Sequence, residues 1–195
     1  MEEFTLYLKL GWQHIADLGA YDHIVFITAL CAVYTVKQWK HLLILVTAFT
    51  VGHSITLALA ALKIVVLPSN IIEFLIPVTI FLTAISNVLF PVKTEDNKVR
   101  FSTTYPIVVF FGLIHGLGFS NYFTALLGTE QSIVKPLLAF NIGLEVGQLL
   151  IVAVVLLLAT ITMRLLKLTQ RDWSLFISGA VAGIALILMS ETKFW

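Results

Sequence analysis

Runs of about 20 apolar residues, each long enough to cross a lipid bilayer, follow one another along most of this chain. Only 12% of the residues are charged and 59% are hydrophobic, whereas ordinary soluble domains have about 25% and about 45–50%. So little charge cannot cover a globular surface, which argues against a soluble enzyme or a disordered protein. The net charge of +1 leaves no basic patch for nucleic acid. We therefore expect the lipid bilayer to surround the chain.

Charged residues and prolines divide the apolar runs into six expected transmembrane helices. We predict an all-α fold, a polytopic membrane helix bundle that forms one domain over residues 1–195. Residues 4–20, which precede the first long run, are expected to form a short amphipathic helix at the membrane interface. The six spans are expected at residues 22–36, 41–62, 71–92, 105–127, 136–163 and 173–191.

The placement of Lys and Arg predicts the orientation in the membrane, because cytoplasmic loops carry the excess of positive charge. One side would hold Lys37, Lys40, Lys93, Lys98, Arg100, Arg164, Lys167 and Arg171. The other side would hold only Lys9, Lys63, Lys135 and Lys193. The first side is therefore expected to be cytoplasmic and both termini extracytoplasmic. The acidic start, Met1-Glu2-Glu3, is unlike the positively charged start of a cleavable signal peptide.

Ionisable side chains inside the spans are functional candidates, because each costs roughly 2.5–3.5 kcal/mol at the bilayer centre. In the expected orientation these groups gather in the outer half of the membrane, which predicts a polar cavity open to the extracytoplasmic side. Imidazole and carboxylate groups together suit a divalent transition metal ion such as Ni, Co or Zn. The single Cys31 excludes a site built from several thiolates. The predicted metal ligands are His14, Asp22, His23, His53, His115 and Glu145.

A second group of polar side chains is expected to line the substrate path or to support the ligands: Ser54, Thr56, Glu73, Asn87, Asn141 and Gln148. Asn141, Glu145 and Gln148 share one helix face, since they are spaced i, i+4 and i+7. Two of the assignments have an alternative. Glu73 can complete a helix N-terminus after Ser69-Asn70, and Asn87 can bond to a neighbouring helix.

Three pairs of glycines at four-residue spacing predict close helix packing: Gly112 with Gly116, Gly143 with Gly147, and Gly179 with Gly183. His41, beside Lys40, is expected at the cytoplasmic interface and outside the metal site.

Four stretches of the chain resemble the HupE/UreJ family of small bacterial membrane proteins, in particular its second branch. They are GWQHI with GAYDH (residues 11–15 and 19–23), FTVGHSITL (49–57), FGLIHGLGF (111–119) and FNIGLEVGQ (140–148). The resemblance implies a six-span protein of the bacterial inner membrane, in a family of nickel or cobalt permeases that serve hydrogenase and urease. His14, Asp22 and His23 match the His and Asp-His signature of the family's first helix, although the gap after His14 is longer here.

The same residues fit two principal functions. The first is a divalent-metal permease, with the metal ion as substrate and a metalloenzyme maturation system as a partner; the resemblance favours it. The alternative is a membrane-embedded zinc-dependent hydrolase that acts on a lipid or a membrane peptide, with Glu145 as the catalytic general base. The lack of ionisable residues in the cytoplasmic half favours the hydrolase. A structural subunit, held together by its polar cluster, is the third possibility.

Overall fold

A computed structural model describes residues 2–90, 97–128 and 132–195, and in this part of the chain all regular structure is helical. The expected all-α membrane bundle is confirmed. Lys93 and the last two residues of the span expected at 71–92 lie outside the described residues. The helices are α1 (Glu2–Ile15), α2 (Asp22–Cys31), α3 (Trp39–Ala61), α4 (Ser69–Leu89), α5 (Asn97–Leu127), α6 (Val134–Leu166) and α7 (Gln170–Thr192), with a 3₁₀ turn over Val36–Gln38.

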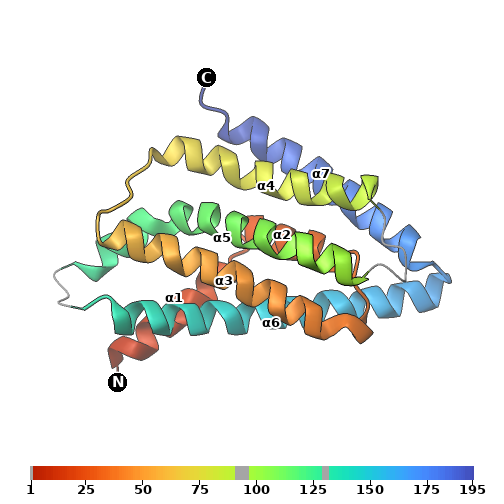
Figure 1. Cartoon of the computed structure of the whole chain (residues 1–195), viewed down its shortest axis with the longest axis horizontal. Helices are drawn as coiled ribbons and strands as arrows, with labels where there is room; N and C mark the ends of the chain where they lie inside the picture. The colour runs from red at the N-terminus through yellow and green to blue at the C-terminus, as the bar shows by residue number, and fades with distance from the viewer. Residues whose placement is uncertain (1, 91–96, 129–131) are drawn as a thin grey trace.

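Five of the described helices, α3 to α7, are long and apolar enough to cross a membrane. They lie side by side along the long axis of the molecule (Figure 1). The first expected span, 22–36, is shorter than predicted, because α2 ends at Cys31. At 1.5 Å per residue α2 is about 15 Å long, which is half the thickness of the hydrocarbon core.

The N-terminal helix packs along α6 with one face, while most of its other residues are exposed, and its C-terminal end reaches into the bundle. Its Gly11 contacts the backbone of α6 at Phe140 and Leu144, and Ile15 contacts Gly147. The stretch of α6 from Val134 to Gly147 is about 20 Å long, so α1 ends deep in the bundle. The next helix, α2, begins near this point and packs against α6, α4 and α7. We therefore describe α1 and α2 as two halves of one broken crossing.

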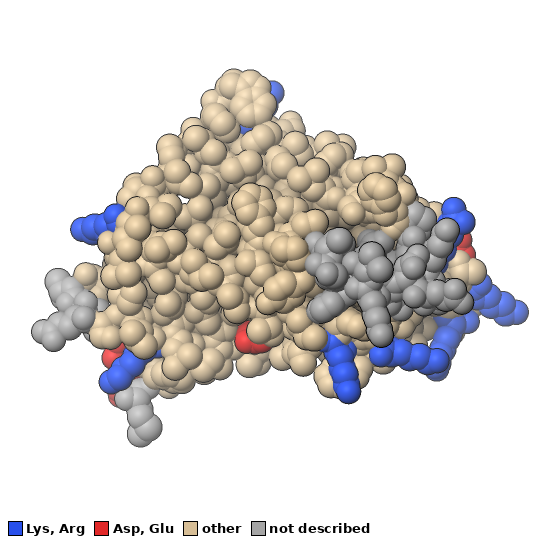
Figure 2. Space-filling model, in the orientation of Figure 1, with Lys and Arg blue, Asp and Glu red and all other residues tan. Residues whose placement is uncertain are grey.

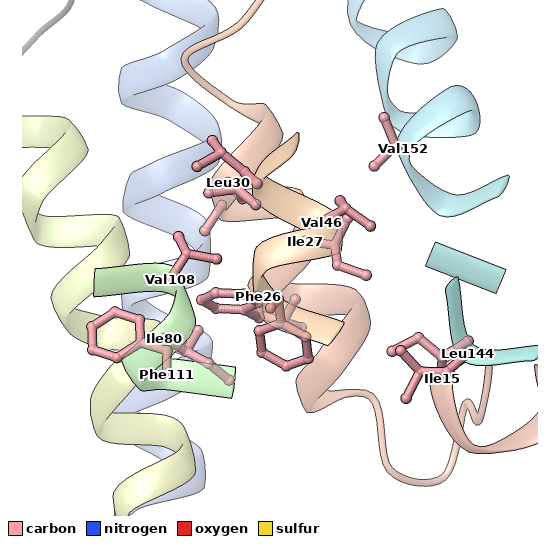
Figure 3. Packing of buried hydrophobic residues seen from close by; sticks show 14 of the residues in the cluster. Ile15, Phe26, Ile27, Leu30, Val46, Ile80, Val108, Phe111, Leu144 and Val152 are labelled. Carbon is pink, nitrogen blue, oxygen red and sulfur yellow. The ribbon is translucent and has the colours of Figure 1, made fainter. Parts of the chain in front are cut away.

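The core packs around this break. Figure 3 shows Ile15 of α1 beside Leu144 of α6, and Ile27 of α2 on the same side as Val46 of α3. All four side chains are buried, with at most 2% of each exposed. Both halves of the broken crossing are thus held by the same core as the long helices.

Two pairs of helices approach until their backbones touch. A Cβ atom on Gly11 would collide with the carbonyl of Phe140, and one on Gly143 with the carbonyl of Leu8, so α1 and α6 meet through reciprocal glycines. Gly112 of α5 meets the carbonyl of Phe49 on α3 in the same way. The third expected pair, Gly179 and Gly183 on α7, does not pack closely, because nothing lies within 4 Å of a Cβ at either position.

Local sequence signals mark the turn between α6 and α7. α6 ends at Leu166, and the next residue, Lys167, adopts the left-handed conformation with φ of 53°. α7 begins with a capping box, in which the Thr169 amide donates to Asp172 Oδ2 (2.9 Å) and the Asp172 amide donates to Thr169 Oγ1 (3.2 Å). This turn directs α7 back along α4.

Charged groups gather at the two ends of the bundle, and a largely uncharged band separates them (Figure 2). Both termini lie at the same end of the long axis as the turn between α3 and α4 (Figure 1). The opposite end, where α3 and α7 begin, carries Lys37, Lys40, Arg164, Lys167 and Arg171. This charge distribution is the one expected from the Lys and Arg count.

The glycine contact between α1 and α6 generates the first prediction. Gly143→Ala is expected to lower stability by about 1–3 kcal/mol, because the new methyl group forces the two backbones apart. Gly179→Ala is the matched control and should be neutral or stabilising, since the position is open and alanine favours helix. Thermal unfolding of the detergent-solubilised protein measures both. Equal losses for the two variants would contradict the close α1–α6 contact.

Candidate metal centre

Four imidazoles and one carboxylate meet where the first crossing is broken. His14 stands in the last turn of α1, and Asp22 and His23 form the first turn of α2. Glycines at the helix contacts lie next to two of these histidines. His14 follows Gly11 by one turn of α1, and His53 follows Gly52 directly on α3. The fourth imidazole, His115 of α5, lies between two glycines that contact α3.

The ligand atoms form two groups of three that share one residue. One group is His14, His23 and His53; the other is Asp22, His23 and His115. Within each group the atoms lie within 4.8 Å of one another, a spacing that a bound ion can bridge after small side-chain movements. The ring centroid of His23 lies 4.6 Å from that of His14 and 5.1 Å from that of His115.

Five of the imidazole nitrogens in this cluster lack hydrogen-bond partners among the described residues. They are Nε2 of His14, Nε2 of His23, both ring nitrogens of His53, and Nδ1 of His115. A buried polar atom left unpaired costs about 1–3 kcal/mol, and a shared ion would satisfy one nitrogen from each of the four rings, since a neutral imidazole offers one lone pair. Neutral imidazole is a ligand for Zn, Ni and similar ions. The donor set therefore fits a divalent transition metal ion.

Asp22 orients His23. Its Oδ1 accepts a hydrogen bond from the backbone amide of His23 (2.9 Å) and lies 3.1 Å from Nδ1 of the same residue. An ionised carboxylate only accepts, so Nδ1 carries the proton and Nε2 keeps its lone pair. A carboxylate behind a metal-binding histidine is a common supporting arrangement. Asp22 is also placed to bind an ion itself, since it belongs to the group of three with His23 and His115.

Thr79 of α4, which sequence reasoning missed, contacts the cluster through His115. Its Oγ1 lies 2.9 Å from Nε2 of His115, and both side chains are buried. A lone threonine in an apolar helix has no pattern that marks it out, because such residues usually bond their own backbone.

Glu145 does not join the imidazoles. Its Oε1 accepts a hydrogen bond of 2.6 Å from Thr47 of α3, and it belongs to neither group of three ligands. Gln148 likewise accepts from Thr50 of α3 (2.8 Å). The expected polar face of α6 thus bonds to α3, although Asn141, its third member, donates only to Leu137 of its own helix (2.8 Å).

Three of the remaining candidates of the second group hydrogen bond to backbone carbonyls of helices and not to the cluster. Ser54 donates to the carbonyl of Thr50 (2.6 Å), and Thr56 donates to carbonyls of its own helix. Asn87 donates to the carbonyl of Ala29 on α2 (2.8 Å), which agrees with the alternative of a bond to a neighbouring helix. Glu73 is exposed near the start of α4.

Aromatic rings enclose the imidazoles. Phe119 and Phe140 pack on His14, with centroid distances of 4.0 and 5.7 Å. On the other side Phe26 lies 5.3 Å from His115 and 6.2 Å from Phe111. These rings exclude water from most of the cluster, so that His53 is fully buried while His14 is only partly buried.

A cavity of about 310 Å³ begins beyond Phe111, on the side away from the termini. Residues of α2, of the segment after it, and of α4 and α5 line it, and the lining is mainly apolar. The cavity is partly open at the surface of the bundle, because Leu82, Ser86 and Ile107 are exposed. The polar side chains that reach it are Tyr34, Thr83, Ser86, Asn87 and Thr104. Phe111 lies one helical turn before His115, so the ring separates this inner cavity from the metal centre.

The fold and the cluster define a polytopic membrane protein with a buried group of histidines between its helices. The family model described as HupE / UreJ protein matches residues 1–192, and the chain belongs to this family. This confirms the resemblance seen in the sequence. No curated protein and no solved structure matches the chain.

The cluster generates a second prediction. His53→Ala and His115→Ala should each abolish stoichiometric metal binding, because each removes an imidazole with an unpaired ring nitrogen in the cluster. Glu145→Gln should bind metal like the wild type, since Glu145 bonds to Thr47 outside the cluster. His41→Ala, outside the cluster, is the matched histidine control. Elemental mass spectrometry of the purified variants after Ni²⁺ loading measures this, and loss of binding in Glu145→Gln would contradict the assignment.

Proposed function

We propose that this protein is a permease that binds a divalent ion of the nickel or cobalt type at the histidine cluster and moves it across the membrane. The observation that carries the proposal is that two groups of three ligands share His23. The HupE/UreJ family is associated with nickel and cobalt transport or with urease maturation, which supports this choice of substrate.

A shared ligand suits an ion that moves. An ion held by His14, His23 and His53 can exchange two of its ligands for Asp22 and His115 while it stays bound to His23. Conduction needs binding strong enough for entry and weak enough for release, and adjacent sites meet both needs. Protons compete with the metal for every imidazole, so binding should weaken as the pH falls.

The inner cavity supplies the next part of the route. It starts one turn beyond His115 and offers oxygen atoms from Ser86 and Asn87 of α4. Hydroxyl and amide oxygens are weaker ligands for these ions than imidazole, which favours release on this side. Phe26 and Phe111 close the connection in the present arrangement, so transport requires these rings to move.

The zinc hydrolase remains the less supported alternative. It needs a carboxylate next to the ion to take a proton from the bound water. Glu145, which the sequence suggested for this role, hydrogen bonds to Thr47 instead. Ser54 bonds its own helix and is not free to assist.

The location follows from the same proposal. We place the protein in the bacterial inner membrane, with the Lys- and Arg-rich end of the bundle in the cytoplasm and both termini outside. In this orientation His14 marks the extracytoplasmic side of the cluster, and the inner cavity faces the cytoplasm. The transported ion would then be available to the maturation of metalloenzymes.

The third prediction tests transport directly. Proteoliposomes that contain the purified protein should accumulate Ni²⁺ or Co²⁺, measured with an enclosed metal-sensitive dye. His53→Ala and His115→Ala should lose this flux because they lose the binding site, whereas His41→Ala should retain it. Stoichiometric binding without flux, under a gradient of either direction, would contradict the permease and favour a fixed centre.

The fourth prediction separates the route from the binding site. Ser86→Phe should reduce flux strongly, because the ring fills part of the inner cavity, while equilibrium binding of Ni²⁺ should remain near wild type. Thr160→Phe on α6 is a matched control, since Thr160 bonds its own helix and does not line the cavity. Unchanged flux in Ser86→Phe would show that ions leave by another path.

A further inference from the structure

We propose that Thr79 is a positioning residue of the metal centre: its hydroxyl selects the tautomer of His115 and turns the Nδ1 lone pair toward the metal ion. The part of this proposal that concerns metal binding rests on the proposed function. The tautomer itself depends only on the contacts of α4 with α5.

The argument starts from the two hydrogen bonds of the Thr79 hydroxyl. It donates to the carbonyl oxygen of Ile76 at 2.7 Å, and it lies 2.9 Å from Nε2 of His115. A carbonyl oxygen can only accept, so the single hydroxyl proton must point to Ile76 if both bonds are to form. The Thr79 oxygen can then only accept from His115, and Nε2 must carry the ring proton.

This assignment determines the other nitrogen of His115. A neutral imidazole has one protonated nitrogen and one with a free lone pair. With the proton on Nε2, Nδ1 is the nitrogen that can bind a metal. Nδ1 is also the atom that lacks a hydrogen-bond partner in the structure, and His115 belongs to the ligand group of Asp22 and His23.

Burial makes the selection effective. Thr79 is 2% exposed and His115 is 1% exposed, so water does not compete for either group. In such surroundings the opposite tautomer would make Nε2 an acceptor that competes with the Ile76 carbonyl for the single proton of the Thr79 hydroxyl, so one of these hydrogen bonds would be lost. Thr79 thus does for His115 what Asp22 does for His23, but with the opposite ring nitrogen left free.

The arrangement gives α4 a role in the centre, although α4 supplies no residue to either ligand group. The hydroxyl of Thr83, one turn further along α4, donates to the carbonyl of Thr79 (2.8 Å) and touches no histidine in the hydrogen bonds of the structure. Thr83 is therefore a matched control for a threonine of the same helix face that lacks the proposed role.

The first experiment reads the tautomer without any metal. Protein labelled with ¹⁵N-histidine is compared by nitrogen NMR as wild type, Thr79→Val, Thr79→Ser and Thr83→Val, and the His115 signals are assigned by their loss in His115→Gln. We expect protonated Nε2 in the wild type, Thr79→Ser and Thr83→Val, and a changed or mixed tautomer in Thr79→Val. Protonated Nδ1 in the wild type, or an unchanged spectrum in Thr79→Val, would overturn the proposal.

The second experiment measures Ni²⁺ affinity of the same variants by equilibrium dialysis at neutral pH. Thr79→Val should bind about 10–100-fold more weakly, as is usual when the support of a metal ligand is lost. Thr79→Ser should restore the affinity because it keeps the hydroxyl, and Thr83→Val should not change it. Failure of serine to restore binding would mean that threonine acts through packing and would also overturn the proposal.

The two experiments distinguish the failure of this proposal from that of the proposed function. A wild type that binds no Ni²⁺ or Co²⁺ would contradict the permease, while the NMR comparison would still decide the role of Thr79. A wild type that binds metal and is unaffected by Thr79→Val would contradict only the positioning role.

Discussion

The backbone contact between α1 and α6 is the constraint on which the metal centre depends. α1 is too short to cross a membrane alone, and it reaches the middle of the bundle because Gly11 and Gly143 let the two helices touch. This approach places His14 against the first turn of α2. A side chain at either glycine would move α1 outward and take one of the four imidazoles with it.

The position of the metal centre is energetically unfavourable unless its polar groups find partners. Irregular backbone and polar side chains at membrane depth persist only where they are buried in protein or line a polar cavity. The break between Ile15 and Asp22 introduces irregular backbone and polar side chains into the bundle, and the imidazoles beside it have nitrogens without hydrogen-bond partners. A cation is the partner that can satisfy several acceptor nitrogens at once. The break in the helix and the metal centre are thus two aspects of one arrangement.

The sequence predicts the membrane bundle and the four histidines well, because apolar length and the cost of buried charge are local properties of the chain. It predicts a helix at the N-terminus but not its packing, since the amphipathic pattern of residues 4–20 does not reveal that the glycines of α6 contact it. Glu145 shares a helix face with Gln148 as expected, yet both side chains accept hydrogen bonds from threonines of α3. Thr79 is invisible in the sequence because its role exists only through its tertiary contact with His115.

The separation of Glu145 from the cluster bears on how tightly an ion is held. Neutral imidazoles add no charge, so a divalent ion bound with Asp22 alone retains a net charge of +1. In surroundings of low dielectric this uncompensated charge is costly. A second carboxylate would neutralise the ion and deepen its binding, which suits a permanent cofactor. One carboxylate among four imidazoles instead allows selection by nitrogen ligands without the full electrostatic hold, and an ion that must leave again requires this balance.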